Sequence, residues 1–369
     1  MAGRIIIVLR CRIITFVGLA GRVVGKRSGA LLAVCVLTVT AAGCSGRAVS
    51  ASAQTPDPAH STVRSFASPD PTSTPTPGAA AGPPPLPVST VRQLPDGAFY
   101  LLAGRDLGSL NVWEITPDGR ERLLTRCHRG SGIDGFAASR AGIVLAEASG
   151  GADNLARLTS HGPAWLRPDG DGGALLRGSS PDIRGNGTIG YVTPPGNAGR
   201  HGAPADFAIW IRRSFTGPAG MLLRQRRALD GPVFGPDDGV AVEGWVGQPG
   251  KRQPGIIIYG HGRVRRLSIG VPAIPSLVAW GEHAPALALA FPANDAELLF
   301  PDGQRQPLPA GWQPLAWNPG GSELLMQSAT ALGIWSRSAP GQVTRIGRIS
   351  PGAQILQAAW LDRKAPLGS

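Results

Sequence analysis

Residues 313–326 read QPLAWNPGGSELLM, in which an apolar run ending in tryptophan is followed by a proline and glycine turn and a second apolar run. The same order recurs in SLVAWGEHAPALALAF at 276–291 and in PVFGPDDGVAVEGWV at 232–246. Weaker copies occupy residues 132–148 and 180–192. Short apolar runs between Gly and Pro turns are typical of β-strands, so the sequence predicts an all-β fold.

The residue that ends the first apolar run of each copy recurs at a fairly regular spacing. Successive intervals are 47, 51, 46, 37 and 43 residues. These six anchor positions are Phe136, Ile183, Phe234, Trp280, Trp317 and Trp360. Each copy continues with further strand-like runs, such as LNVWEIT at 110–116 and RERLLT at 120–125. Four strands in about 45 residues are the signature of a β-propeller blade, and regularly spaced aromatic residues favour packing between blades over ligand binding.

The two ends of the repeat region predict how the ring closes. The first unit begins at Gly97 with only three strands, and the chain ends with one orphan strand, ILQAAWLD at 355–362. This strand has the form of the missing first strand, so we expect it to pair with Phe99–Leu102. The sequence therefore predicts a single β-propeller at 96–364 with six four-stranded blades, closed by the C-terminal strand.

Three phrases resemble a known repeat. WNPGGSELLM, SPDIRGNGTIGYV and VWEITPDGRERLLT are similar to the TolB-type, WD-like repeat of bacterial β-propellers. The resemblance covers most of residues 96–362, although each copy is partial. It implies the propeller architecture and no catalytic residues, because that repeat carries none. Combined with the N-terminal segment described next, it implies a bacterial lipoprotein.

The N-terminal 43 residues indicate export. Lys26 and Arg27 precede the apolar run GALLAVCVLTVTAAG, which ends in small residues before Cys44, as in a signal peptide. The ending Ala41-Ala42-Gly43-Cys44 resembles the bacterial lipobox, which implies that Cys44 is lipidated and becomes the mature N-terminus. An ordinary cleaved signal peptide and an uncleaved membrane anchor remain as alternatives. We expect residues 1–43 to be a signal peptide with an N-terminal extension.

The next segment, 44–95, is rich in Ser, Thr, Pro and Ala. Such a composition buries too little apolar surface to fold, and its prolines favour extended conformations. We therefore expect a disordered tether between the lipid anchor and the propeller. A spacer of no particular length is the alternative.

Charge and cysteine content limit the classes of partner. The chain has 36 Lys and Arg against 24 Asp and Glu, a net charge of +12, but six of these basic residues lie in 1–43, which has no acidic residue. The other arginines are scattered, for example Arg265 and Arg266, without the interleaved aromatic residues that nucleic-acid binding uses. We expect no nucleic-acid partner. Cys127 is the only cysteine after Cys44, so a buried thiol is expected there.

The sequence lacks the common catalytic motifs. It has no Gly-x-Ser-x-Gly elbow and no phosphate-binding Gly-x-x-x-x-Gly-Lys-Ser/Thr loop. No His has a metal-ligand spacing to another His or Cys, and His161 and His261 are expected in turns. The segment Asp169-Gly170-Asp171-Gly172-Gly173 begins like a calcium loop but has Ser180 where the closing Glu is needed. The sequence thus predicts no catalytic, metal or cofactor site.

Two functions follow from these features. The main hypothesis is a non-enzymatic binding or scaffolding module, lipid-anchored at the extracytoplasmic face of the cell membrane, whose partner is an envelope protein, peptide or glycan. The alternative is a lactonase-like hydrolase with a site in the central channel. Apolar inner strands such as QPLAW at 313–317 argue against the alternative, whereas carboxylates that converge at one mouth of the ring would favour it.

The lipobox predicts that Cys44 carries a diacylglyceryl group. Two acyl chains hold a protein stably on a bilayer, whereas one is marginal. Mass spectrometry of the mature N-terminus should show modified Cys44, and Cys44→Ser should release the protein from the membrane fraction. An unmodified mature N-terminus at another residue would contradict the expectation.

Overall fold

The structure is a computed structural model, and it describes a hairpin near the N-terminus and most of the chain from residue 88 onward. The described ranges are 4–9, 12–17, 88–90, 94–105, 110–126, 132–149, 152–168, 175–193, 206–225, 230–248, 251, 253–269, 275–291 and 295–368. The predicted lipidation site Cys44, the lone Cys127 and the calcium-loop-like segment 169–173 lie outside these ranges.

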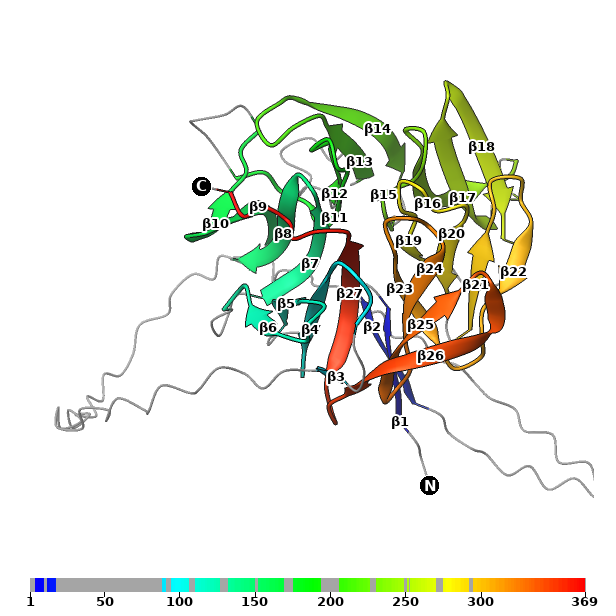
Figure 1. Cartoon of the computed structure of the whole chain (residues 1–369). Coiled ribbons are helices and arrows are strands. Elements are labelled where there is room, and N and C mark those ends of the chain that lie inside the picture. Colours follow the sequence, from blue (N-terminus) through cyan, green and yellow to red (C-terminus); the bar gives the residue numbers. More distant parts are fainter. Residues whose placement is uncertain are drawn as a thin grey trace, which may run out of the picture. The chain divides into compact units, whose positions relative to one another are not determined.

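The described C-terminal part is all-β, and six sheets form a ring (Figure 1). Each sheet forms one blade, whose strands follow one another from the central channel outward. Blade 1 contains β27 (Gln354–Leu361), β4 (Ala98–Gly104), β5 (Asn111–Ile115) and β6 (Glu121–Leu123). Blade 2 contains β7 (Gly132–Ser139), β8 (Gly142–Ser149), β9 (Ala152–Thr159) and β10 (Gly162–Trp165). Blade 3 contains β11 (Ser179–Ile183), β12 (Ile189–Thr193), β13 (Phe207–Arg212) and β14 (Ala219–Gln225).

The other three blades repeat this antiparallel order. Blade 4 contains β15 (Val233–Phe234), β16 (Val240–Val246), β17 (Gln253–Gly260) and β18 (Arg263–Ser268). Blade 5 contains β19 (Ser276–Ala279), β20 (Leu287–Ala290), β21 (Ala296–Leu299) and β22 (Arg305–Pro307). Blade 6 contains β23 (Gln313–Trp317), β24 (Glu323–Gln327), β25 (Ala331–Ser336), β26 (Ala339–Ile349) and a fifth strand, β3 (Val88–Thr90). The predicted six-bladed propeller is confirmed.

Burial decreases from the middle of each blade toward its outer edge. Every residue of β5 is buried, whereas β18 is almost entirely exposed. Middle strands are covered by the neighbouring blades on both faces, which is why they read as continuous apolar runs. Outer strands carry charged residues, which discourage pairing with another chain.

All six anchor residues are buried, with exposed fractions between 3 and 5%. Their role is to fill the space between blades. A side chain at Gly235 in blade 4 would collide with the indole ring of Trp280 in blade 5, so only glycine permits that close approach. Within blade 6, the indole of Trp317 packs edge-on against Trp335 of β25, with ring centroids 6.2 Å apart. The prediction that these residues form core is confirmed.

Ring closure occurs as predicted. The C-terminal strand β27 pairs with β4, and Trp360 stands opposite Phe99 in the ladder. Their ring centroids are 4.8 Å apart, and the indole N–H of Trp360 donates to the carbonyl oxygen of Asp96 at 3.2 Å. The last strand of the chain thus completes the first blade.

The described structure includes residues on both sides of the expected propeller, 96–364. Strand β3 lies inside the predicted tether yet pairs with β26 at the outer edge of blade 6, and Val88 is fully buried. Beyond the other boundary, the N–H of Ala365 donates to the Tyr100 hydroxyl at 2.8 Å, and Gly368 bonds to Leu158 in blade 2. These short pieces are fixed because each gives its backbone hydrogen-bond partners on a strand edge.

The N-terminal hairpin is described by itself. Strands β1 (Arg4–Leu9) and β2 (Arg12–Val17) form a two-stranded sheet and correspond to the two apolar runs of the N-terminal extension. Among the described residues there is no helix with the length and hydrophobicity that crossing a bilayer requires.

The closure ladder makes Trp360 a sensitive position. We expect Trp360→Ala to lower the free energy of unfolding by about 3–5 kcal/mol, the usual cost of deleting a buried aromatic side chain. Met221, which is 53% exposed on β14, supplies the control, and Met221→Ala should change stability by less than about 0.5 kcal/mol. Urea unfolding measures both. Equal losses in the free energy of unfolding for the two variants would mean that the closure ladder contributes little to stability.

Candidate functional site

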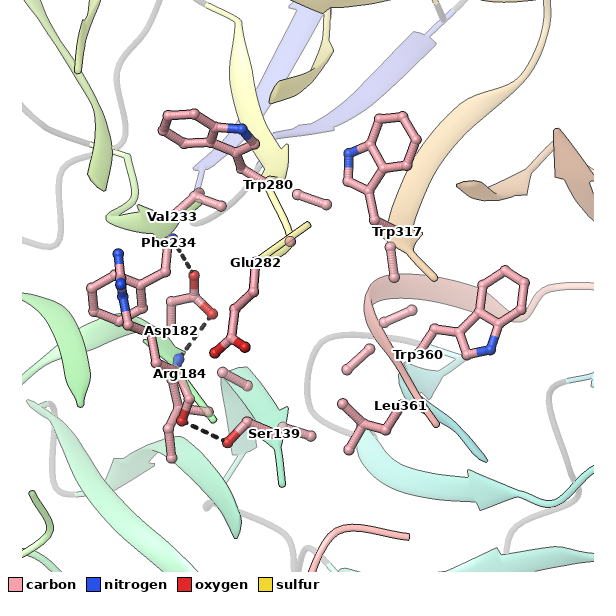
Figure 2. Close-up of a pocket in the computed structure, with 18 of the residues that line it drawn as sticks. Ser139, Asp182, Arg184, Val233, Phe234, Trp280, Glu282, Trp317, Trp360 and Leu361 are labelled. Atoms are coloured by element: carbon pink, nitrogen blue, oxygen red, sulfur yellow. Dashed lines mark hydrogen bonds between the residues drawn. The ribbon is translucent and has the colours of Figure 1, made fainter. Parts of the chain in front are cut away.

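A cavity lies at one mouth of the central channel. It has a volume of about 250 Å³ and is lined by residues from all six blades (Figure 2). The lining comes from the C-terminal parts of the inner strands and the turns that follow them, namely residues 136–140, 180–185, 232–234, 278–283, 316–319 and 357–362. The six anchor residues therefore border this cavity as well as the blade interfaces.

The inner strands are irregular next to the mouth. Five of them contain a register shift in their pairing with the second strand; these shifts lie between Ile133 and Gly135, Ser179 and Asp182, Leu277 and Ala279, Pro314 and Ala316, and Ile355 and Gln357. Such β-bulges bend a strand and redirect its side chains, and they are common beside functional sites.

Side-chain acceptors beside the channel join three pairs of neighbouring blades. Oε1 of Gln357 in blade 1 accepts the N–H of Phe136 in blade 2 at 2.7 Å. Oδ2 of Asp182 in blade 3 accepts the N–H of Phe234 in blade 4 at 2.6 Å. Oδ2 of Asp230, before β15, accepts the N–H of Leu277 in blade 5 at 3.1 Å. Asp182 therefore has a clear structural role at the mouth.

Arg184 also joins blades 3 and 4. Its side chain is only 8% exposed, lies over the ring of Phe234 at 4.7 Å and forms an ion pair with Asp238. Nη2 donates to the carbonyl oxygen of Gly239 at 2.6 Å. Its own carbonyl oxygen accepts from Oγ of Ser139 in blade 2 at 2.9 Å (Figure 2). The guanidinium charge is thus compensated and its donors are used to hold the mouth together.

Glu282 differs from these residues. It follows Trp280 by two positions, is exposed, and points into the middle of the cavity in Figure 2. Its Oε1 accepts the N–H of Gly185 at 2.7 Å, which fixes the carboxylate across the mouth from blade 5 to blade 3. Among the described residues its other oxygen has no hydrogen-bond partner. One carboxylate oxygen of Glu282 is therefore held by the Gly185 N–H, and the other is available to a ligand or water in the cavity.

The cavity lining carries charged side chains of both signs. It holds the carboxyl groups of Asp182, Glu282 and Asp362 and the guanidinium groups of Arg140 and Arg184. Because Asp238 compensates Arg184, carboxylates outnumber the remaining cation.

Sequence reasoning missed this site because it judged the inner strands by their apolar centres. The polar residues sit directly beside the anchors, with Asp182 before Ile183, Arg184 after it, and Glu282 just beyond Trp280. Inspecting the flanks of each anchor would have found them. His161 and His261 do lie in turns, as predicted. Within the described ranges no group of three or more His, Cys, Asp or Glu residues could hold a metal ion.

Comparison with known proteins identifies the fold. No protein-family model matches the sequence, and no curated protein is significantly similar to it. A chain of a nidogen/laminin complex is 13% identical, with a TM-score of 0.50 over 72% of this chain and 98% of that one. An oligogalacturonate lyase in complex with manganese is 14% identical (TM-score 0.44, 69% and 76% covered), and a puromycin hydrolase is 16% identical (TM-score 0.46, 72% and 47% covered).

At these identities the similarities show the β-propeller fold alone. One expectation is corrected here. The sequence predicted that the chain is not an enzyme, partly because the repeat it resembles carries no catalytic residues. The β-propeller fold does not support that prediction, because a fold alone does not decide whether a protein is an enzyme.

The bond from Asp182 to blade 4 can be tested by substitution. Asp182→Ala removes the acceptor of the buried Phe234 N–H, so we expect a loss of about 1–3 kcal/mol in the free energy of unfolding. Asp302→Ala removes an exposed acceptor that bonds only Gln304 in the same turn, and it should cost clearly less. Urea unfolding of both variants makes the comparison. Equal losses in the free energy of unfolding would show that the bond from Asp182 to blade 4 stabilises the fold no more than an exposed turn bond does.

Proposed function

We propose that the chain is a hydrolase that acts on a small ester or lactone in the mouth of its central channel. The observation that supports this proposal is the carboxylate of Glu282, held in the cavity by Gly185 through one oxygen and open through the other. A fixed carboxylate within reach of a water molecule can serve as general base.

The reaction requires few groups. Glu282 removes a proton from water as the water oxygen bonds to the carbonyl carbon of the substrate. The negative charge that develops on the carbonyl oxygen is stabilised by a cation, and Arg140, which lines the same cavity and packs against Gly185, is the candidate. Cleavage of the bond between the carbonyl carbon and the ester oxygen then leaves a carboxylic acid and an alcohol, and the alkoxide takes the proton from Glu282.

The proposed setting is the extracytoplasmic face of the cell membrane. It rests on the lipobox-like Ala41-Ala42-Gly43-Cys44 and on the Pro-rich segment after it. Strand β3 supports an attachment of that segment at the outer edge of blade 6, away from the inner strands that line the mouth. An anchored propeller of this kind would meet substrates released from the cell envelope, such as lactones or esters of sugars.

Hydrolysis can be measured with glucono-δ-lactone, γ-butyrolactone and p-nitrophenyl acetate as probes. We expect turnover of at least one, and Glu282→Gln should lower kcat by about 10²–10⁴-fold, the usual contribution of a general base. The glutamine amide oxygen can still accept the Gly185 N–H, so the fold should be retained. Asp302→Asn, a carboxyl change outside the cavity, should leave kcat unchanged.

Two outcomes would contradict the proposal. An unchanged rate in Glu282→Gln would exclude this residue as the base. Binding of a probe in the mouth without turnover would show a ligand site that does not perform the proposed hydrolysis.

A further inference from the structure

The outer hairpin of blade 4 lies in a stretch of sequence that has basic residues and no acidic ones. Residues 244–281 contain no Asp or Glu. The basic residues in this stretch are Lys251, Arg252, Arg263, Arg265 and Arg266. The last three belong to β18, the outermost strand of blade 4 (Figure 1). Positive charge is therefore concentrated on one edge of the ring.

The three arginines of β18 are exposed and keep their charge. Among the described residues none of them forms an ion pair, and Nη1 of Arg265 donates to a neutral acceptor, the carbonyl oxygen of Pro301, at 2.6 Å. The outer strand of the neighbouring blade 3 differs, because its arginine, Arg224, pairs with Asp206 at 2.9 Å. The charge on β18 is thus available to a partner.

The elements around β18 supply little opposite charge. In blade 5, Glu297 is already paired with Arg305 at 2.7 Å. Asp302 lies in the turn before β22, next to Pro301. At the turn of the β17–β18 hairpin, Nε2 of His261 lies 3.7 Å from Oδ2 of Asp237. These two exposed carboxyl groups do not balance three arginines and the exposed Lys251, so the surface is positive.

An exposed apolar side chain lies between the arginines. Val264 is 44% exposed, and among the described residues Met221 is the other large apolar side chain with such exposure. Basic side chains around an exposed apolar group suit a partner surface that is anionic outside and apolar beneath. The headgroup layer of a bilayer with anionic lipids has this chemistry.

The outer edge of β18 is poorly suited to a further β-strand. Among the described residues β18 pairs with β17 alone, so its other edge is not covered by a strand. Charged side chains on an edge strand oppose the addition of another strand. A negatively charged layer, by contrast, is attracted to every one of these arginines. The charge pattern therefore favours a lipid surface over an extended peptide.

We propose that Lys251, Arg263, Val264, Arg265 and Arg266, the β18 face, dock on the anionic headgroups of a lipid bilayer. The proposal uses the membrane setting proposed above, but it does not depend on hydrolysis at Glu282. A lipid anchor would supply attachment, and the β18 face would supply orientation.

The orientation concerns the mouth of the channel. His261, at the turn of the hairpin, contacts Asp237 in the turn that follows β15. The last residue of β15, Phe234, lines the cavity. The turn of the hairpin thus lies on the mouth side of blade 4, and docking through β18 would hold the mouth close to the headgroups.

The test measures binding of residues 86–369 to lipid vesicles. This piece holds all six blades and the closure ladder but neither the predicted signal peptide nor Cys44, so the predicted anchor contributes nothing. We expect it to sediment with vesicles of phosphatidylcholine and about one third phosphatidylglycerol, and not with pure phosphatidylcholine. Raising NaCl from about 0.1 M to about 0.5 M should release it, because salt screens the attraction.

The decisive variant carries Arg263→Gln, Arg265→Gln and Arg266→Gln together. Each arginine near an anionic membrane strengthens binding about fivefold, so the triple variant should lower the partition coefficient on the order of 100-fold. Its matched control replaces three exposed arginines of blade 6 by glutamine, namely Arg337, Arg345 and Arg348. The control should bind within about threefold of the unsubstituted piece, because its charges lie outside the β18 face. Thermal unfolding checks that both variants fold.

Three results would overturn the proposal. Equal binding to neutral and anionic vesicles would exclude headgroup charge as the attraction. Equal losses in the two triple variants would show that total charge, and not the β18 face, determines binding. Binding to long-chain polyphosphate without binding to vesicles would assign the face to a soluble polyanion. Hydrolysis by Glu282 is measured without vesicles, so the two proposals can fail separately.

Discussion

The pairing of β27 with β4 is the constraint on which the remainder of the structure depends. It joins residues 98–104 to residues 354–361, the two ends of the propeller, in one antiparallel ladder. Without it, blade 1 would lack its inner strand, and the faces between blades 1 and 6 would be exposed to water. The cavity at the channel mouth also depends on this ladder, because residues 357–362 form one side of its lining.

Once the ring is closed, polar groups near the channel divide into those that hold blades together and those left for a ligand. Gln357, Asp182 and Asp230 each accept a backbone N–H from the following blade. The guanidinium group of Arg184 donates hydrogen bonds to Asp238 and Gly239 in blade 4. Glu282 alone among these five combines a single fixed oxygen with a position in the open cavity. This division is why a mouth with several charged residues supports one candidate base.

Much of the fold could be predicted because the anchors are large, buried and regularly spaced. Trp280, Trp317 and Trp360 are buried between strands, and their recurrence in the sequence indicates where successive blades begin. Strand β3 could not be predicted, since its three residues sit in a Pro-rich segment and gain order only from the edge of β26. The bulge in β7 was equally hidden, because a bulge depends on pairing register, which a local sequence pattern does not contain. Glu282 read as a turn residue, and only ring closure shows that its turn faces a cavity.

The central claim is that this mouth is where the chain meets its ligand. The most direct measurement is a crystal structure of the chain grown with gluconate, the hydrolysis product of glucono-δ-lactone. The account predicts electron density for gluconate in the mouth, with one of its oxygens within hydrogen-bond distance of the Glu282 carboxylate. Gluconate bound only elsewhere on the propeller, or a mouth without gluconate at saturating concentration, would contradict it.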